Sequence, residues 1–172
     1  MKRLVRLLMI NWYRLEQASI DIVGHTAVIG PNASGKSSLL DAIQAVLVGG
    51  DKRWWNPNAS AGEKSTRSLR DYCLGVVRDP NNPDLSQEFR PRDQAVTYLA
   101  LVFRDEGSGE PTSIGLALHA RLDEAQEVID GRFLAPGLDL VLSDLVDRTP
   151  EGPIPKPWQR LKEDLRRRIG ES

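Results

Sequence analysis

The feature that most constrains the fold is a glycine-rich run that fits the pattern G-x-x-x-x-G-K-[ST]: Gly30, Pro31, Asn32, Ala33, Ser34, Gly35, Lys36 and Ser37. Four apolar or small residues, 26–29, precede it, and a helical pattern follows over residues 38–48. A strand, a glycine loop and a helix in this order form a phosphate-binding loop, in which backbone N–H groups and the helix dipole face an anion. There Lys36 would reach the β- and γ-phosphates and Ser37 would ligate Mg²⁺. The run predicts a nucleoside triphosphate site.

The bulk properties of the chain limit what else it does. Its 172 residues suffice for one domain with a full core. A net charge of −1 gives no global attraction to nucleic acid, so any DNA contact would need a local basic patch. One cysteine, Cys73, excludes a disulfide framework and fits a reducing compartment. We find no signal-peptide pattern and no segment that would cross a bilayer, and we expect a cytoplasmic protein.

The periodicity of apolar residues changes along the chain. The first part predicts short strands at residues 4–10, 20–22 and 26–29 and helices at 38–48 and 67–77. The second part predicts an antiparallel meander of strands at residues 95–104, 112–121 and 127–134. Residues 138–146 are ambiguous between helix and strand, residues 150–157 form a proline-rich connector, and residues 158–168 form a charged helix.

Two families with a phosphate loop fit poorly. A guanine-nucleotide switch needs an N-K-x-D motif downstream of the loop, and the sequence has none. A small-molecule kinase alternates strands with helices to its end, whereas this chain ends in a meander.

Three segments carry a resemblance to a further family: residues 10–14 (INWYR), 20–22 (IDI) and 28–43, which contain G-x-N-x-x-G-K-S-S-L-L-D-A-I. They resemble the amino-terminal lobe of an ABC-type ATPase head of the SMC group. Within this group the chain looks most like the MukB-like condensins, on the evidence of residues 12–14, 41–44 and 67–75. It most resembles the SMC-like subunit of Wadjet (Jet/Ept) anti-plasmid systems, and in second place the MksB-type condensins.

The resemblance implies an α/β P-loop NTPase fold with a mixed sheet, a phosphate-loop helix and an antiparallel β-meander. Residues 1–157 would form the amino-terminal lobe, and residues 158–172 would start a coiled-coil helix. The family's glycine-rich signature and Walker B strand, which would supply the base that activates water, are absent. Two apolar runs that end in acidic residues, at 99–106 and 138–144, imitate a Walker B strand imperfectly. In the family both elements lie in a carboxyl-terminal lobe beyond a long coiled coil, so we assign no catalytic residue here and expect the isolated chain to be nearly inactive.

The resemblance also extends the predicted site. Ser38 follows the motif, and Arg14 stands where break-repair ATPases have an arginine near the nucleotide phosphates; the alternative for Arg14 is a surface position at a strand end. Asn11 and Tyr13 are weaker candidates for lining the nucleotide. The family's Q-loop glutamine has no secure counterpart among Gln44, Gln94, Gln126 and Gln159, and Ser143 or Asp144 are alternatives.

A basic loop is the candidate contact with DNA. Residues 51–70 carry two tryptophans, Trp54 and Trp55, among five cations: Lys52, Arg53, Lys64, Arg67 and Arg70. Basic side chains neutralise backbone phosphates without reading sequence. In SMC heads this region resembles part of the DNA-clamping surface, and the competing interpretation is a solvated loop with a tryptophan pair in the core.

The function that the resemblance implies is ATP- and Mg²⁺-dependent. The chain would be half of a head that dimerises on ATP and acts on double-stranded DNA by loop extrusion, with a kleisin and accessory subunits, near the nucleoid. Plasmid defence of the Wadjet type comes first among the biological roles. The alternatives are a chromosome-organising MksB-type condensin, a RecF- or break-repair-type DNA repair ATPase, and a nucleotide-gated interaction module without hydrolysis.

Overall fold

The computed structural model describes residues 1–31, 34–57, 67–77 and 91–170. In chain order the elements are β1 (Lys2–Trp12), β2 (Leu15–Asp21), α1 (Lys36–Leu47), α2 (Leu69–Leu74), β3 (Gln94–Asp105), β4 (Pro111–Arg121), β5 (Val128–Pro136), α3 (Leu142–Leu145), β6 (Val146–Thr149), β7 (Gly152–Pro155) and α4 (Trp158–Gly170). The predicted meander, the phosphate-loop helix and the terminal helix are confirmed. The helix expected at residues 67–77 is shorter, because Gly75 ends it in a left-handed conformation.

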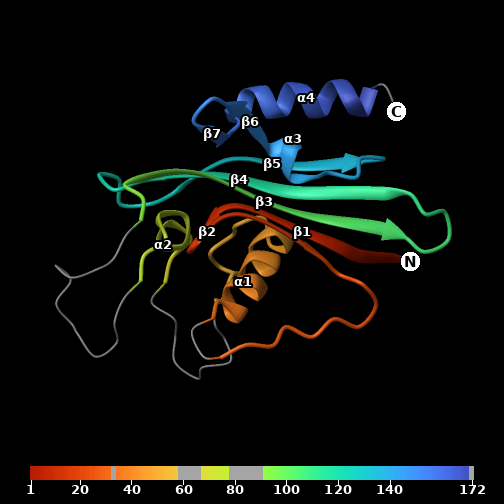
Figure 1. The fold of residues 1–172 in the computed structure, drawn as a ribbon, viewed down its shortest axis with the longest axis horizontal. Helices are drawn as coiled ribbons and strands as arrows, with labels where there is room; N and C mark the ends of the chain where they lie inside the picture. Colours follow the sequence, from red (N-terminus) through yellow and green to blue (C-terminus); the bar gives the residue numbers. More distant parts are fainter. Residues whose placement is uncertain (32–33, 58–66, 78–90, 171–172) are drawn as a thin grey trace.

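One five-stranded sheet, in the order β2-β1-β3-β4-β5, organises the molecule (Figure 1). Each pair of neighbouring strands is antiparallel, so the expected mixed sheet is wrong for the described residues. A parallel strand would have come from residues 26–29, but these residues form no ladder, and Ile29 is 92% exposed. An apolar run becomes a strand only beside a neighbouring strand, and the described chain offers this one none.

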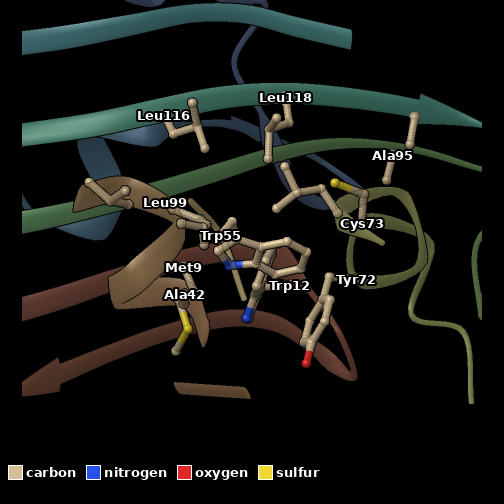
Figure 2. Close-up of a cluster of buried hydrophobic side chains, with 14 of the residues drawn as sticks. Met9, Trp12, Ala42, Trp55, Tyr72, Cys73, Ala95, Leu99, Leu116 and Leu118 are labelled. Carbon is tan, nitrogen blue, oxygen red and sulfur yellow. The ribbon is translucent and has the colours of Figure 1, made fainter. Parts of the chain in front are cut away.

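The first core lies between the sheet and helices α1 and α2, which share one side of it (Figure 1). Three aromatic side chains gather in this core (Figure 2): Trp12 stacks on Tyr72 with ring centroids 4.5 Å apart, and Trp55 meets Tyr72 edge-on at 5.6 Å. Both indole N–H groups donate to carbonyls of α1, Trp12 to Ser38 at 2.7 Å and Trp55 to Asp41 at 3.1 Å. The aromatic cluster therefore fixes the helix that follows the phosphate loop.

The second core lies on the opposite face of the sheet, under α3, the β6–β7 hairpin and α4 (Figure 1). Leu161 and Leu165 of α4 are buried there. The Trp158 ring covers Gly131 of β5 so closely that a Cβ atom on Gly131 would lie 2.1 Å from it. Thus α4 is part of the core at this face, and a coiled coil that starts from it stays a prediction. Residues 150–157, expected to form a proline-rich connector, instead include β7, which pairs with β6 in a hairpin.

Candidate functional site

Glycine stands at both ends of the phosphate loop, and the backbone conformation favours it at Gly35. At Gly30 a Cβ atom would lie 2.7 Å from the Ser34 hydroxyl, and Gly35 has a φ of 93°, which side chains disfavour. Gly35 immediately precedes the first residue of α1, Lys36. The Lys36 ammonium group donates to the carbonyls of Gly30 (2.7 Å) and Pro31 (2.6 Å), so the lysine folds back over its own loop.

The loop lines a cavity of about 600 Å³ that is open on one side. Its lining residues are Tyr13, Arg14, Leu15, Ala18, Ile20, Val28, Ile29, Gly30, Pro31, Ser34, Gly35, Lys36, Ser38 and Leu39. Two of these residues, Arg14 and Lys36, are cations, and no described lining residue is a carboxylate. One wall is apolar, and the other presents the loop. The cavity is therefore built for an anionic group with an apolar or aromatic part attached.

The amino terminus of α1 strengthens this preference for an anion. A helix leaves its first N–H groups without intrahelical partners and carries a positive partial charge there. At α1 the N-cap residue is Gly35, no side-chain cap comes from the described residues, and the first turn contains no acidic residue. A phosphate group would accept from the free N–H groups and interact favourably with the dipole.

The predicted site residues fall into three groups. Gly30, Pro31, Ser34, Gly35, Lys36, Ser38 and Arg14 line the cavity, and Asn32 and Ala33 lie outside the described residues. Ser37, the predicted Mg²⁺ ligand, is exposed in the first turn of α1 and is not a lining residue. Asn11 does not line the cavity: its amide donates to the Val96 carbonyl at 2.9 Å, beside a different depression. The structure therefore does not bring Asn11 to the cavity with the phosphate loop.

The turn that brings Arg14 to the cavity is unusual. Trp12 pairs with Leu15 in the β1–β2 ladder, which leaves Tyr13 and Arg14 as a two-residue loop. Tyr13, the first residue of this loop, has a φ of 52°. In two-residue hairpin loops with one positive φ, this first position is usually glycine. Such backbone strain costs about 1–3 kcal/mol and persists only where the surroundings hold it. Nothing in the sequence indicated this turn, because a tyrosine is not a turn signal.

Polar side chains connect α1 to α2. The Tyr72 hydroxyl of α2 donates to the carboxylate of Asp41 on α1 at 2.5 Å, and both side chains are buried. The Arg67 guanidinium lies over the Tyr13 ring, 5.0 Å from its centroid, and hydrogen-bonds to Tyr72. Burial and the Asp41 carboxylate raise the pKa of Tyr72 well above its usual value, so this hydroxyl stays protonated and donates.

The two runs that imitate a Walker B strand have structural roles. Asp105 accepts from the N–H groups of Gly107 and Ser108 in the β3–β4 turn, which lowers its pKa. In the second run, Asp139 pairs with Arg6 at 2.7 Å and with Arg104 at 2.5 Å. Asp144 accepts from the Val141 N–H at the start of α3. None of these carboxylates lines the cavity.

Two of the five cations in the predicted basic loop are neutralised by carboxylates of the chain, and Arg70 is held by carbonyls. Lys52 pairs with Glu127 at 2.9 Å and Arg53 with Asp51 at 2.6 Å, and Arg70 donates to the carbonyls of Arg121 and Leu122. Lys64 lies outside the described residues. The two tryptophans separate: Trp55 is buried in the first core and Trp54 is exposed. Trp55 therefore fits the interpretation that places the tryptophans in the core and Trp54 does not, while contact with DNA stays a prediction.

The four glutamines considered for the Q-loop do not line the cavity. Gln44 accepts from the Asn56 N–H, and Gln126 accepts from Lys52. Gln94 borders the depression beside Asn11, and Gln159 belongs to α4. Within the described ranges, no group of three or more His, Cys, Asp or Glu side chains is placed to hold a metal ion. Nor does any helix in those ranges have the length and apolar character to span a membrane.

Comparisons with known proteins agree with the loop geometry. Residues 4–64 match the family described as the P-loop containing region of AAA domain. The chain is 30% identical over 139 residues to the vitamin B12 import ATP-binding protein BtuD of Vibrio atlanticus (strain LGP32), covering 80% of this chain and 46% of BtuD. It is 48% identical over 56 residues to the chromosome partition protein Smc of Bacillus subtilis (strain 168), covering 32% of this chain and 4% of Smc.

The chain thus spans less than half the length of these two relatives. The similarity to Smc is higher but shorter, and the similarity to BtuD extends over most of the chain. The family match, the two relatives and the observed loop agree on one conclusion: the chain contains a P-loop region related to ABC- and SMC-type ATPases.

Proposed function

We propose that the chain is the ATP-binding half of an SMC-like ATPase head that dimerises on ATP and acts on double-stranded DNA. One observation carries this proposal. The phosphate loop and the amino terminus of α1 line a cavity with two cations and no carboxylate among its described lining residues. A triphosphate supplies the missing negative charge, and the apolar wall of Leu15, Ile20 and Val28 suits a nucleoside.

The same cavity supports binding without rapid hydrolysis. Hydrolysis needs an acidic residue near the γ-phosphate to hold the metal ion and orient water, and no described lining residue is one. The residues present fit Mg²⁺ only in part. The exposed Ser37 hydroxyl would be a protein ligand, and phosphate oxygens of ATP would supply further ligands. The ion would neutralise phosphate charge. The remaining ligand and the base would come from another lobe.

An exposed apolar surface supports a missing lobe. Leu40 and Leu47 lie seven residues apart on α1, which places them on one face of the helix, and they are 64% and 60% exposed. Val28 and Ile29, just before the loop, are also exposed and unpaired. Here an apolar segment that pairs with no strand accompanies a helix with exposed leucines. Exposed apolar surface of this kind is typical of a surface that another unit covers. We propose that a carboxyl-terminal lobe carrying the signature and Walker B strand covers it.

The wider assembly is proposed from the resemblance. A second head would meet this one across ATP, a kleisin and accessory subunits would complete the complex, and its DNA work would be loop extrusion near the nucleoid. Wadjet-type plasmid defence is our first choice, before an MksB-type condensin or a RecF- or break-repair-type enzyme. The loop of residues 51–70 stays our candidate for DNA contact, although Lys52 and Arg53 would have to exchange their carboxylates for phosphates.

The test uses nucleotide titration with and without the rest of the head. We expect the chain to bind ATP with Mg²⁺ weakly and Lys36→Ala to abolish binding, and we expect DNA-stimulated hydrolysis only after the carboxyl-terminal lobe is added. A chain that binds no better than Lys36→Ala would refute the nucleotide site. A completed head that binds ATP without turnover would favour the second candidate, a nucleotide-gated interaction module. The absence of carboxylates from the described cavity lining is the observation that supports this candidate.

A further inference from the structure

The strained β1–β2 turn is held from several sides by groups outside the phosphate loop. The Tyr13 N–H donates to the Tyr72 carbonyl at 2.7 Å, which ties the turn to α2. The Tyr13 ring lies under the Arg67 guanidinium. At Gly75, just past α2, a Cβ atom would lie 2.5 Å from the Tyr13 carbonyl oxygen, so the turn and the end of α2 pack backbone against backbone.

Arg92 makes the most extensive of these contacts. One guanidinium nitrogen, Nη1, donates to the Tyr13 carbonyl at 2.8 Å and to the Cys73 carbonyl at 3.3 Å. The other, Nη2, donates to the Leu15 carbonyl at 3.1 Å. A planar fork of donors thus spans the carbonyls on both sides of Arg14, which only an arginine provides. The side chain is partly buried, and this burial lowers its pKa.

These contacts have a consequence for the cavity. Tyr13 and Arg14 both line it, and Arg14 is exposed and makes no ion pair among the described residues. A long exposed cation normally samples many conformations and loses entropy when it binds. A turn clamped at the carbonyls before and after Arg14 fixes the direction in which this side chain leaves the backbone.

We propose that Arg92 is a positioning residue of the nucleotide site: it clamps the β1–β2 turn so that Arg14 faces the phosphates beside Lys36. The proposal rests on the proposed function, and it names what orients the second cation of that site. Arg92 itself does not line the cavity. It acts through Arg14, and this dependence is measurable.

The test is a double-mutant cycle between Arg14 and Arg92. Arg92→Lys keeps the charge and removes the fork, and Arg104→Lys is the matched control, because Arg104 bridges the Gly109 carbonyl and Asp139 far from the turn. ATP and inorganic triphosphate affinities are measured by displacement of a fluorescent ATP analogue. Hydrogen exchange of the Arg14 and Leu15 amides without ligand is the second readout.

We expect Arg14→Ala and Arg92→Lys each to weaken both ligands about tenfold and the double variant to be no worse than Arg14→Ala alone. Arg104→Lys should stay within about twofold of the unaltered chain. Exchange at the turn should quicken in Arg92→Lys only. Additive losses, or an unchanged affinity in a chain that binds ATP, would overturn the positioning role. Absence of binding in the unaltered chain would instead refute the proposed function, while the exchange readout still reports whether Arg92 holds the turn.

Discussion

Removal of one hydroxyl at the base of the phosphate-loop helix should destabilise the whole protein. In Tyr72→Phe the ring stays, so the stacking on Trp12 and the edge contact with Trp55 persist and no cavity forms. What is lost is the hydrogen bond to the Asp41 carboxylate, a group that is only 4% exposed, together with the hydrogen bond to the Arg67 guanidinium. Because water cannot replace the lost donor at such a site, the buried carboxylate keeps part of its desolvation cost.

The size of the effect follows from that bond. Hydrogen bonds to charged groups contribute about 1.5–3 kcal/mol, and in a chain of this length about 1 kcal/mol corresponds to 2–4 °C in Tm. We therefore expect Tyr72→Phe to lower the free energy of unfolding by about 2 kcal/mol and Tm by about 4–8 °C. Urea denaturation followed by tryptophan fluorescence and a thermal scan measure both quantities.

Two controls make the reasoning refutable. Tyr13→Phe removes a hydroxyl for which the described residues offer no hydrogen bond, so its effect should stay below about 0.5 kcal/mol. In an Asp41→Asn background the acceptor is neutral, and the cost of Tyr72→Phe should fall to about half. Equal losses in Tyr72→Phe and Tyr13→Phe, or an undiminished loss beside Asn at position 41, would show that the buried bond is not the cause.

Three further predictions follow from burial and close packing. Burial raises the pKa of the Cys73 thiol to about 12, so on raising the pH the unfolded chain loses this proton before the folded chain does. The free energy of unfolding should therefore fall between about pH 9 and pH 12 by up to about 1.4 kcal/mol per pH unit. In Cys73→Ala, denaturant midpoints measured over the same range should show a smaller fall. Gly131→Ala drives a methyl group into Trp158 and should cost about 2 kcal/mol with a changed near-UV signal, whereas Gly170→Ala meets no atom within 4 Å and should be neutral in the same assay. Asp105→Ala should lower Tm by a few degrees through its turn, and a titration that found weaker ATP binding would revive the Walker B interpretation.

Local sequence signals predicted the local parts of the site. The phosphate loop and α1 depend on glycines, a lysine and a helical repeat that lie within twenty residues, so their sequence suffices. The strand expected at residues 26–29 depends on a neighbour, and its residues alone cannot supply one. The β6–β7 hairpin was hidden because two of its residues, Pro153 and Pro155, lack the N–H group that a ladder normally uses.

Alternation along β1 shows a second limit. Leu7 and Met9 enter the first core and Leu8 and Ile10 the second, so strict alternation would send Trp12 to the second core. Asn11 has a φ of 51°, which turns the chain over and delivers Trp12 to the phosphate-loop helix instead. The left-handed conformation of Asn11 thus decides which face of the sheet receives a large aromatic side chain. The apolar periodicity of the sequence does not predict this conformation.

Charge pairing is the third limit. The cations of residues 51–70 looked like a basic patch, yet the carboxylates that neutralise Lys52 and Arg53 include one from a distant part of the chain, Glu127. Arg92 attracted no attention in the sequence because its partners are backbone carbonyls, which every residue has. Such partners become visible only when the fold brings β1, α2 and the start of β3 together.

The antiparallel ladder between β1 and β3 has a consequence for how the chain folds. Leu8 pairs with Ala100, whereas β3, β4 and β5 are joined by short turns. Closing a loop of about ninety residues costs chain entropy that local hairpins avoid, so the meander should form first and β1 should dock onto it later. The phosphate loop lies inside that long connection, and its cavity takes shape only after β1 has docked. Folding intermediates populated before this step should therefore contain sheet structure but no site for an anion.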